Sequence, residues 1–249
     1  MGVGSSARPT KTAEIVARQI VSAITRAHMA PGDRLPSEAE MLAELGVGRA
    51  TLREALRYLE LQGVLVIRPG AKGGPTVAPP DARGIAASLS LVLQANRTPF
   101  RTIVRSRTLL EPLVAAEAAA NAKETGSLDE LRESVEKIEQ SNGDAAAFLA
   151  ENGRFHELVA WASGNVVFAY LIGSLHWIID GSALGVQYPE WAQTPTIKAH
   201  RKIYEAIKAG DQARAAREME KHNKSFEGYL NDHYPQVLDQ IVHWGQQGG

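Results

Sequence analysis

The chain has 249 residues, of which 44% are hydrophobic and 22% carry a charge, enough to fill a sizeable core and to form two domains. It contains no cysteine, which excludes disulfides, thiolate zinc sites and cysteine nucleophiles. The net charge of −1 hides an asymmetry, because residues 1–78 hold 10 Lys and Arg against 7 Asp and Glu, whereas the remainder holds 17 against 21. The N-terminal part is therefore the one suited to nucleic acid.

The chain is expected to begin with a tail and a helix. Residues 1–10 are rich in Gly and Ser and lack the apolar segment of a signal peptide, so we expect a disordered tail there. Over Lys11–Met29, Val16 and Ile20 fall on one helical face, and Pro31-Gly32 ends the helix.

Two short helices joined by a tight turn are predicted over Leu35–Gly63. Ser37 and Glu40 form a capping box, so the first of these helices begins at Ser37. Gly46 can take the left-handed conformation that ends it. The second helix begins at Arg49. Its predicted buried stripe, at positions i, i+3, i+4 and i+7, consists of Leu52, Ala55, Leu56 and Leu59.

Three arginines, Arg49, Arg53 and Arg57, recur every four residues on a different face of this second helix. Each guanidinium can neutralise a phosphate or donate to the O6 and N7 atoms of guanine in the major groove. The alternative is an ordinary solvated basic face. The arginines alone therefore do not decide between DNA binding and a solvated face, and the segment that follows is needed to distinguish them.

That segment predicts a β-hairpin. A β-branched run, Val64–Arg68, and a short strand, Pro75–Val77, flank a glycine-rich tip, Pro69–Gly74. Lys72 at this tip can contact the DNA backbone or the minor groove, and the glycines let the main chain come close. A helix-turn-helix followed by such a hairpin is a winged helix, which favours DNA binding over a solvated face.

From Arg83 onward the sequence predicts helix almost throughout, in six or seven helices. The predicted fold is therefore mainly α: an N-terminal winged helix-turn-helix, with three helices and a β-hairpin wing, followed by an all-α helical bundle. We place the winged helix at 11–78, a linker and connecting helix at 79–98, the helical domain at 99–232 and a C-terminal tail at 233–249. The predicted breaks between helices are Asn96–Pro99, Glu124–Ser127, Ser141–Asp144, Ser163–Asn165, Gly181–Thr196 and Gly210.

One segment, Leu158–Ile179, is long and apolar enough to be checked as a membrane span. Ser163-Gly164-Asn165 interrupts it, and Asn165 can cap a new helix. No flanking basic cluster marks an orientation. We therefore expect two core helices and no membrane partner.

A second group of residues contains histidines. Asn152 and His156 share a helical face because they are four residues apart. His200 and His222 lie at nearly equal distances from a predicted turn at Gly210-Asp211, which puts both about 15 Å along a helical hairpin, side by side. This geometry suits shared ligation of one metal ion, and the alternative is that each is an ordinary core or surface histidine.

Four motifs stand out in the N-terminal part, Pro31-Gly32, Leu35–Glu38, Arg49–Leu56 and Leu61–Leu65. Together they resemble the motifs of the GntR family of bacterial transcription regulators. The resemblance implies that Arg49, Thr51 and Arg53 contact the operator and that Gly70 lies at the DNA-facing wing tip. Ala39 departs from the pattern, because many members carry a DNA-contacting arginine there.

The C-terminal part contains five further motifs, Arg107–Glu111, Phe155-His156, Ser163–Asn165, His200–Ile207 and Asp211–His222. Together they resemble the all-helical FCD effector domain of the FadR subfamily. The resemblance implies a divalent metal, often zinc or nickel, which members commonly bind through an Asp, a His four residues later and two further histidines. The matching positions are Asn152, His156, His200 and His222. In the family a small carboxylate often completes the coordination sphere, held by an arginine that matches Arg107.

Three points of this resemblance stay open. An amide at Asn152 is a weaker ligand than a carboxylate, so the metal site should be weaker and more positive. Arg107 has an alternative role as an ion-pair partner of Glu111, its i+4 neighbour. His176 matches no motif position, and we expect a packed core histidine rather than a residue of the cavity.

The expected function is a ligand-responsive repressor that binds a palindromic double-stranded DNA operator as a homodimer. Its effector would be a small organic acid, and it would act in the bacterial cytoplasm, at the nucleoid. One alternative is a metal-free regulator that responds to fatty acyl-CoA, as the subfamily's namesake does. Another is a metal-dependent enzyme, but the sequence has no HExxH motif and no nucleophile signature, so we expect no enzyme.

Overall fold

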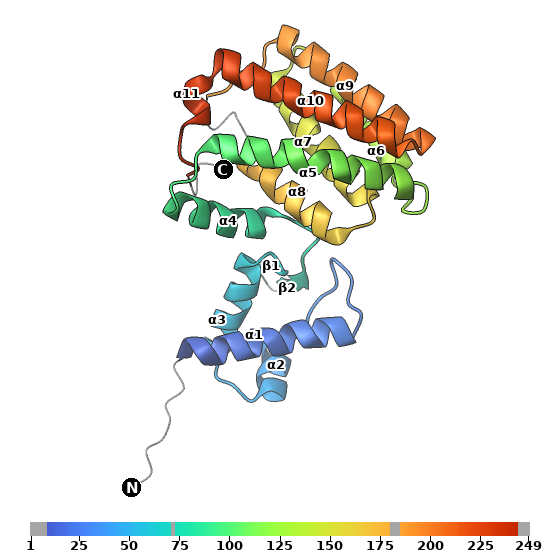
Figure 1. Ribbon diagram of the computed structural model, residues 1–249. Coiled ribbons are helices and arrows are strands. Elements are labelled where there is room, and N and C mark those ends of the chain that lie inside the picture. Colours follow the sequence, from blue (N-terminus) through green and yellow to red (C-terminus); the bar gives the residue numbers. More distant parts are fainter. Residues whose placement is uncertain (1–8, 71–72, 180–184, 244–249) are drawn as a thin grey trace. The chain divides into compact units, whose positions relative to one another are not determined.

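A computed structural model describes residues 9–70, 73–179 and 185–243 (Figure 1). They form two compact units that divide between Gly84 and Ile85, each with its own hydrophobic core. The predicted fold class is confirmed, since a winged helix-turn-helix precedes an all-helical unit. Among the described helices, none combines the length and hydropathy needed to cross a bilayer.

The N-terminal unit begins with three helices. Ser37 caps α2 as predicted: its hydroxyl accepts from the backbone N–H of Glu40, whose carboxylate accepts from the Ser37 N–H at 2.8 Å. Gly46 ends α2 with a left-handed φ of +63°. These caps fix where the turn between α2 and α3 begins. The three helices are α1 (Pro9–Arg26), α2 (Glu38–Leu45) and α3 (Arg49–Leu61).

Helix α1 differs from its predicted range at both ends. It begins at Pro9, since proline fits the first position of a helix, so the expected tail at 1–10 is too long. Residues 1–8 of that tail lie outside the described residues. The helix ends at Arg26 rather than Met29 because His28 takes a φ of +49°, which no helix accommodates.

The predicted stripe of α3 is confirmed, and it packs against α1 in the core of this unit. The predicted wing is present as well: β1 (Leu65–Arg68) pairs antiparallel with β2 (Gly74–Val77), with Leu65 opposite Val77. Four buried residues, Leu52, Ala55, Leu56 and Leu59, form the stripe.

The second unit contains eight described helices, against the predicted six or seven. Apart from the segment before α9, the predicted breaks fall between helices, including the one that divides Leu158–Ile179 at Ser163–Asn165. Asn165 caps α8 by accepting from the N–H of Val167 at 3.0 Å. The helices are α4 (Arg83–Ala95), α5 (Phe100–Asn121), α6 (Leu128–Gln140), α7 (Ala145–Ala162), α8 (Val166–Ile179), α9 (Glu190–Ala209), α10 (Gln212–His233) and α11 (Pro235–Leu238).

Two predicted boundaries in this unit are wrong. The break expected at Gly181–Thr196 is too long, because α9 begins at Glu190, after Pro189, and accommodates Pro195 within its early turns. Residues 180–184 of that break lie outside the described residues. Helix α9 therefore includes a proline that sequence patterns read as a stop.

The expected C-terminal tail at 233–249 is also wrong in its described part. Val237, Leu238 and Val242 are buried in the core, and the N–H of Phe100 donates to the carbonyl of Gln240 at 2.8 Å. So few apolar residues do not establish a helical period, which is why the pattern read as a tail. Residues 244–249 lie outside the described part of the chain.

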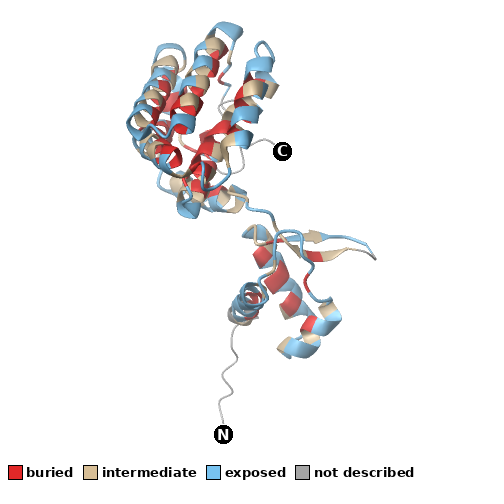
Figure 2. Cartoon of the chain, turned by 90° about the vertical axis from the view of Figure 1, so that its right-hand side faces the viewer, coloured by how far each residue is buried: buried red, intermediate tan, exposed pale blue. Residues whose placement is uncertain are grey.

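Helix α5 runs through the helical unit and packs against α7, α8, α9 and α10 (Figure 1). Buried residues line the inward sides of the helices in each unit, as the red segments of Figure 2 show. Residues on the inward face of α5 therefore meet side chains from all four partner helices.

Candidate functional site

The arginine row of α3 is exposed, as binding to DNA requires. Arg49, Arg53 and Arg57 all lie on the exposed face. Nε of Arg53 lies 3.3 Å from a carboxylate oxygen of Glu38, and Nη1 of Arg57 lies 2.7 Å from one of Glu60. Exposed ion pairs of this kind contribute only about 0–1 kcal/mol, so a DNA phosphate or guanine can replace these carboxylates.

The other predicted DNA-binding residues are Thr51, Gly70 and Lys72. Thr51 is half-buried, and Gly70 is exposed at the wing with a φ of +101°, a conformation that favours glycine. Lys72 lies outside the described residues. Sequence reasoning missed Arg34, whose Nη2 donates to the carbonyl of Gly73 at 2.8 Å and so ties the segment before α2 to the wing. Its only sequence signal is its place just before the Leu35–Glu38 motif.

The histidine cluster lies in the helical unit, where three helices bring His156, His200 and His222 together. One nitrogen of each ring lies within 4.8 Å of the others, and all three side chains are buried. The predicted hairpin is confirmed, since Gly210 ends α9 with a φ of +74° and Asp211 caps α10. The rings of His200 and His222 accordingly lie side by side, with centroids 4.9 Å apart.

The geometry of this cluster fits a metal ion. Nε2 of His156 lies 3.1 Å from Nε2 of His222, and two nitrogens on one tetrahedral zinc lie about 3.3 Å apart. Both ring nitrogens of His200 are buried and have no hydrogen-bond partner in the described part of the chain. An unsatisfied buried polar group costs about 1–3 kcal/mol, which coordination of an ion would offset.

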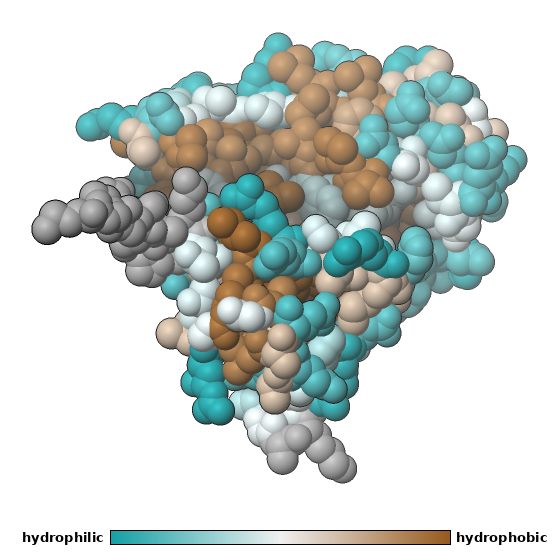
Figure 3. All heavy atoms as spheres, turned by 90° about the horizontal axis from the view of Figure 1, so that it is seen from below, coloured by the Kyte–Doolittle hydropathy of each residue, from teal (hydrophilic) through white to brown (hydrophobic). Residues whose placement is uncertain are grey.

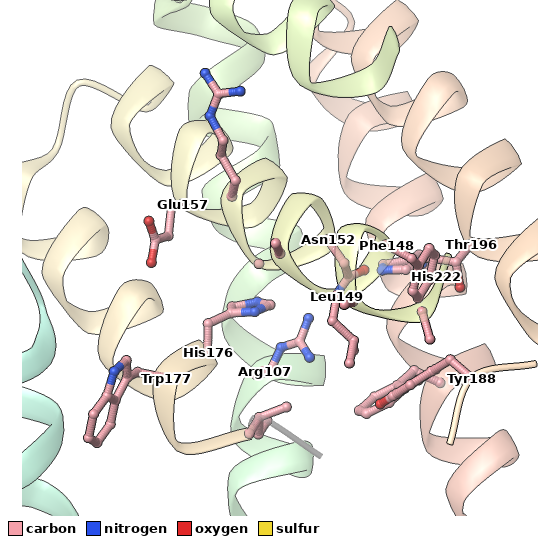
Figure 4. A pocket seen from close by; sticks show the side chains of 17 residues that line it. Arg107, Phe148, Leu149, Asn152, Glu157, His176, Trp177, Tyr188, Thr196 and His222 are labelled. Atoms are coloured by element: carbon pink, nitrogen blue, oxygen red, sulfur yellow. The ribbon is translucent and has the colours of Figure 1, made fainter. Parts of the chain in front are cut away.

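Asn152 lies one turn before His156 on α7. Its side chain is half-buried and lines the same cavity as His222 (Figure 4). An amide oxygen is a neutral metal ligand, so Asn152 would bring no charge to the site. Three imidazoles and one amide would therefore leave the full charge of a divalent ion uncompensated by its ligands.

Glu111 was missed as a site residue, although it contacts His156 of the cluster and three other buried polar side chains. Its carboxylate contacts Nε of Arg107 at 2.5 Å, Nδ1 of His156 at 2.8 Å and Nε2 of His176 at 3.1 Å. It also accepts from the side-chain amide of Asn223 at 3.2 Å. The ion pair between Arg107 and Glu111, left open as an alternative, is therefore present and completely buried.

His176 corrects a second expectation. It is buried, as expected of a core histidine, but it also lines the cavity. Its ring stacks on the ring of His156, with the two centroids 4.4 Å apart. The contact with Glu111 ties it to the same network. The signal in the sequence was weak, because His176 lies on α8, far in sequence from the motif positions.

Burial sets the protonation states of the cluster. It lowers the pKa of His156 to about 3 and that of His176 to about 4, and the pKa values of His200 and His222 lie well below the ordinary value for the same reason. For Glu111, burial alone would raise the pKa, but Arg107 and the two histidine contacts outweigh it and hold the pKa well below its usual range. At neutral pH the imidazoles are therefore uncharged, with lone pairs ready for an ion, and Glu111 is ionised.

A cavity of about 940 Å³ opens beside the cluster (Figure 4). Arg107 borders it, with its guanidinium 5.5 Å from the ring centroid of Phe226. Since this cationic group and the histidines meet aromatic and aliphatic walls, the cavity can hold a small anion with an apolar part. The lining includes Arg107, Phe148, Asn152, His176, Tyr188 and His222.

An exposed arginine row on a winged helix-turn-helix is suited to binding DNA, and the second unit contains a cavity beside a buried histidine cluster. Together they define a class of protein, the transcription regulators whose DNA binding responds to a ligand.

Comparisons with known proteins identify the family. Residues 12–72 match the gntR family of bacterial regulatory proteins, and residues 102–225 match the FCD domain. The chain is 30% identical over 220 residues to the HTH-type transcriptional repressor NanR of Klebsiella aerogenes, covering 86% of this chain and 84% of that protein. It is 29% identical over 218 residues to the uncharacterized HTH-type transcriptional regulator YcbG of Bacillus subtilis, covering 87% and 88%. The chain thus belongs to the GntR family.

A solved structure agrees with this assignment. The Streptococcus agalactiae GntR structure matches with a TM-score of 0.65 and 25% sequence identity, covering 87% of this chain and 99% of that one. The similarity extends over both units of the chain. The Klebsiella aerogenes and Bacillus subtilis relatives are both named as regulators of transcription.

Proposed function

We propose that this protein is a homodimeric repressor whose binding to a palindromic operator is controlled by a small organic acid at a divalent metal, zinc or nickel. It would act in the bacterial cytoplasm, at the nucleoid. The observation that supports metal binding is the convergence of three buried histidine nitrogens, together with the lack of any hydrogen-bond partner for His200 among the described residues.

In this proposal residues 11–78 bind the operator. Two recognition helices α3, related by the two-fold axis of a dimer, enter successive major grooves about 34 Å apart. Arg49, Thr51 and Arg53 read base edges and phosphates at the start of α3. The remaining contacts, to the sugar-phosphate backbone, come from Arg57, Gly70 and Lys72.

Residues 99–232 would bind the metal and the effector. His156, His200 and His222 hold the ion, and Asn152 completes the protein ligands. The bound ion supplies a concentrated positive charge at the wall of the cavity. The protein ligands are neutral, so they leave the positive charge of the ion uncompensated. Glu111 balances the charge of Arg107 and not that of the ion. The ion therefore attracts a carboxylate, to which Arg107 can also donate hydrogen bonds.

Two alternatives fit the observations less well. A metal-free acyl-CoA sensor gives no role to three histidine nitrogens within 4.8 Å of one another. A metal-dependent enzyme needs a general base placed at the reacting atom, whereas the carboxylate of Glu111 is occupied by Arg107, His156 and His176. We therefore favour a regulator over either.

The test begins with selection of an operator from random duplex DNA by the purified protein. The affinity for that operator is then measured with a panel of small carboxylates, once with zinc or nickel and once after treatment with a chelator. We expect at least one carboxylate to change the affinity about tenfold, or about 1.4 kcal/mol, only when metal is present. The same response in metal-free protein would exclude the metal-dependent mechanism.

A further inference from the structure

Helix α5 carries an exposed apolar stripe that no described part of the helical unit covers. Leu109 is 57% exposed and Leu113 is 62% exposed, although the opposite face of α5 is buried. Hydrophobic residues gather in brown areas on the face of the molecule that Figure 3 shows. The stripe on α5 differs from a mere patch because charged residues border both of its ends.

The charges at the two ends are opposite in sign. Arg105 lies four residues before Leu109, and Glu117 lies four residues after Leu113. All four side chains are exposed and follow one i+4 row, the kind of ridge that packs into a neighbouring helix in the commonest helix–helix contact. Along the helix, the row therefore consists of a cation, two leucines and an anion.

Arg105 and Glu117 are not used within the described structure. Neither makes a hydrogen bond or an ion pair with another described residue. They cannot pair with each other, since twelve residues of helix separate them by about 18 Å. Two other exposed arginines of this unit do pair with a carboxylate, Arg101 with Asp239 and Arg132 with Glu136.

The row is symmetric about the level of residue 111. Arg105 and Glu117 lie equally far from that level on either side, and so do Leu109 and Leu113. If a second copy of α5 packs antiparallel across a two-fold axis at this level, Arg105 of each copy faces Glu117 of the other. Leu109 then faces Leu113 twice. Such self-complementarity is what an interface between identical subunits requires.

We infer that the exposed row of α5, Arg105–Leu109–Leu113–Glu117, is the dimer interface of the helical domain and binds a second copy of this chain, antiparallel. This inference deepens the proposed function, because it rests on the homodimer proposed there. The interface would also bring the two effector sites close to the dimer axis, since Arg107 and Glu111 lie on the opposite face of the same helix. An effector that moves α5 would then change how the two subunits pack.

Other exposed apolar groups lack this pattern. Val166 and Val167 at the start of α8 are 54% and 70% exposed, but they are two adjacent residues and form no row along a helix. Val167 therefore serves as a control position, equally accessible but outside the proposed contact.

Because the chain contains no cysteine, the pairing can be tested by disulfide formation in the full-length protein. Leu109→Cys and Leu113→Cys are prepared separately, mixed to exchange subunits, oxidised and separated on a non-reducing gel. The antiparallel pairing predicts at least about tenfold more covalent dimer in the mixture than in either variant alone, because a disulfide needs Cα atoms about 6 Å apart. The control mixture pairs Leu113→Cys with Val167→Cys.

A charge exchange provides a second, independent measurement. Arg105→Glu and Glu117→Arg each put like charges at both ends of the interface, so each should raise the dissociation constant of the dimer on the order of tenfold in sedimentation experiments. The double variant Arg105→Glu/Glu117→Arg restores opposite charges across the axis and should return the constant to within about threefold of wild type.

The outcomes separate this inference from the proposed function. A wild-type dimer that binds the operator but gives no more cross-linking in the Leu109→Cys and Leu113→Cys mixture than in the Val167→Cys control overturns the α5 interface alone. A double charge variant no better than the single ones overturns it as well. A wild-type protein that stays monomeric with and without operator overturns the proposed homodimer itself.

Discussion

Nδ1 of His156 lies 2.8 Å from a carboxylate oxygen of Glu111, while Nε2 of the same ring lies 3.1 Å from Nε2 of His222. One imidazole thus joins a buried carboxylate to the histidine cluster. A carboxylate beside the distal ring nitrogen orients a metal-binding histidine and raises its basicity. In the proposed metal centre Glu111 is therefore the residue that positions His156.

The first prediction concerns this positioning role. Glu111→Gln should lower the metal affinity about 10- to 100-fold, because the neutral amide orients His156 less firmly. The affinity is measured by competition with a chelating dye at pH 7, with Glu130→Gln, an exposed position on α6, as the matched control. Since the substitution also leaves the buried Arg107 unpaired, circular dichroism must show a folded protein at the assay temperature. An unchanged metal affinity in folded protein would show that Glu111 does not position His156 for metal binding.

The second prediction concerns the ligand that departs from the family pattern. Asn152→Asp should raise the metal affinity by at least about tenfold, or about 1.4 kcal/mol, because the carboxylate adds a negative charge beside the ion. The same charge should weaken carboxylate binding, measured by calorimetry on metal-loaded protein. If Asn152→Asp and wild type bind the ion equally, position 152 is not a ligand.

The third prediction is a dependence of stability on pH in the metal-free protein. Burial lowers the pKa of His156 to about 3 and that of His176 to about 4, so below pH 6.5 the unfolded chain binds more protons than the folded one. Their contribution to stability is complete above pH 6.5 and is lost as the pH falls towards 4. We expect the free energy of unfolding in urea to fall by about 2 kcal/mol per buried histidine between pH 7 and pH 5.

The exposed His233 provides the control for this experiment, because His233→Ala should leave the pH dependence unchanged. The pH 7 to 5 window lies above the ordinary titration of carboxylates, so Glu111 contributes little to the slope. A stability that is constant from pH 7 to pH 5 would show that the cluster is not buried as described.

The fourth prediction concerns DNA binding. Arg53→Ala should abolish specific binding to the selected operator while leaving the helical content unchanged, because it removes a guanidinium from the exposed row of α3. Arg18→Ala, at an exposed position on α1, is the matched control. Glu38→Ala should retain binding, since the ion pair of Glu38 with Arg53 is exposed and DNA can replace it. Normal operator affinity in Arg53→Ala would refute the assignment of α3 as the recognition helix.

Local signals in the sequence were sufficient to predict much of the fold. The capping box at Ser37 and Glu40 located α2, and the left-handed Gly210 with the Asp211 cap located the α9–α10 hairpin. That hairpin in turn placed His200 beside His222, because helical rise is fixed. Features that depend on neighbouring residues could therefore be predicted.

The rest of the site depends on contacts between helices that are distant in sequence. Glu111 on α5 meets His156 on α7 and His176 on α8 only through tertiary packing, so no spacing rule revealed its central position. The burial of Val237 and Leu238 has the same origin, since a short apolar segment becomes core only when other helices offer it a surface. Local sequence patterns do not show which surfaces of helices distant in sequence meet.

The central claim is that the three histidines hold a metal ion. The most direct test is elemental analysis of the protein purified without chelators, compared with the double variant His200→Ala/His222→Ala. We predict about one zinc or nickel ion per chain in the wild type, as expected of a single closed site, and none in the variant. No metal in the wild type after incubation with divalent ions, or equal metal in both proteins, would contradict the proposed metal centre.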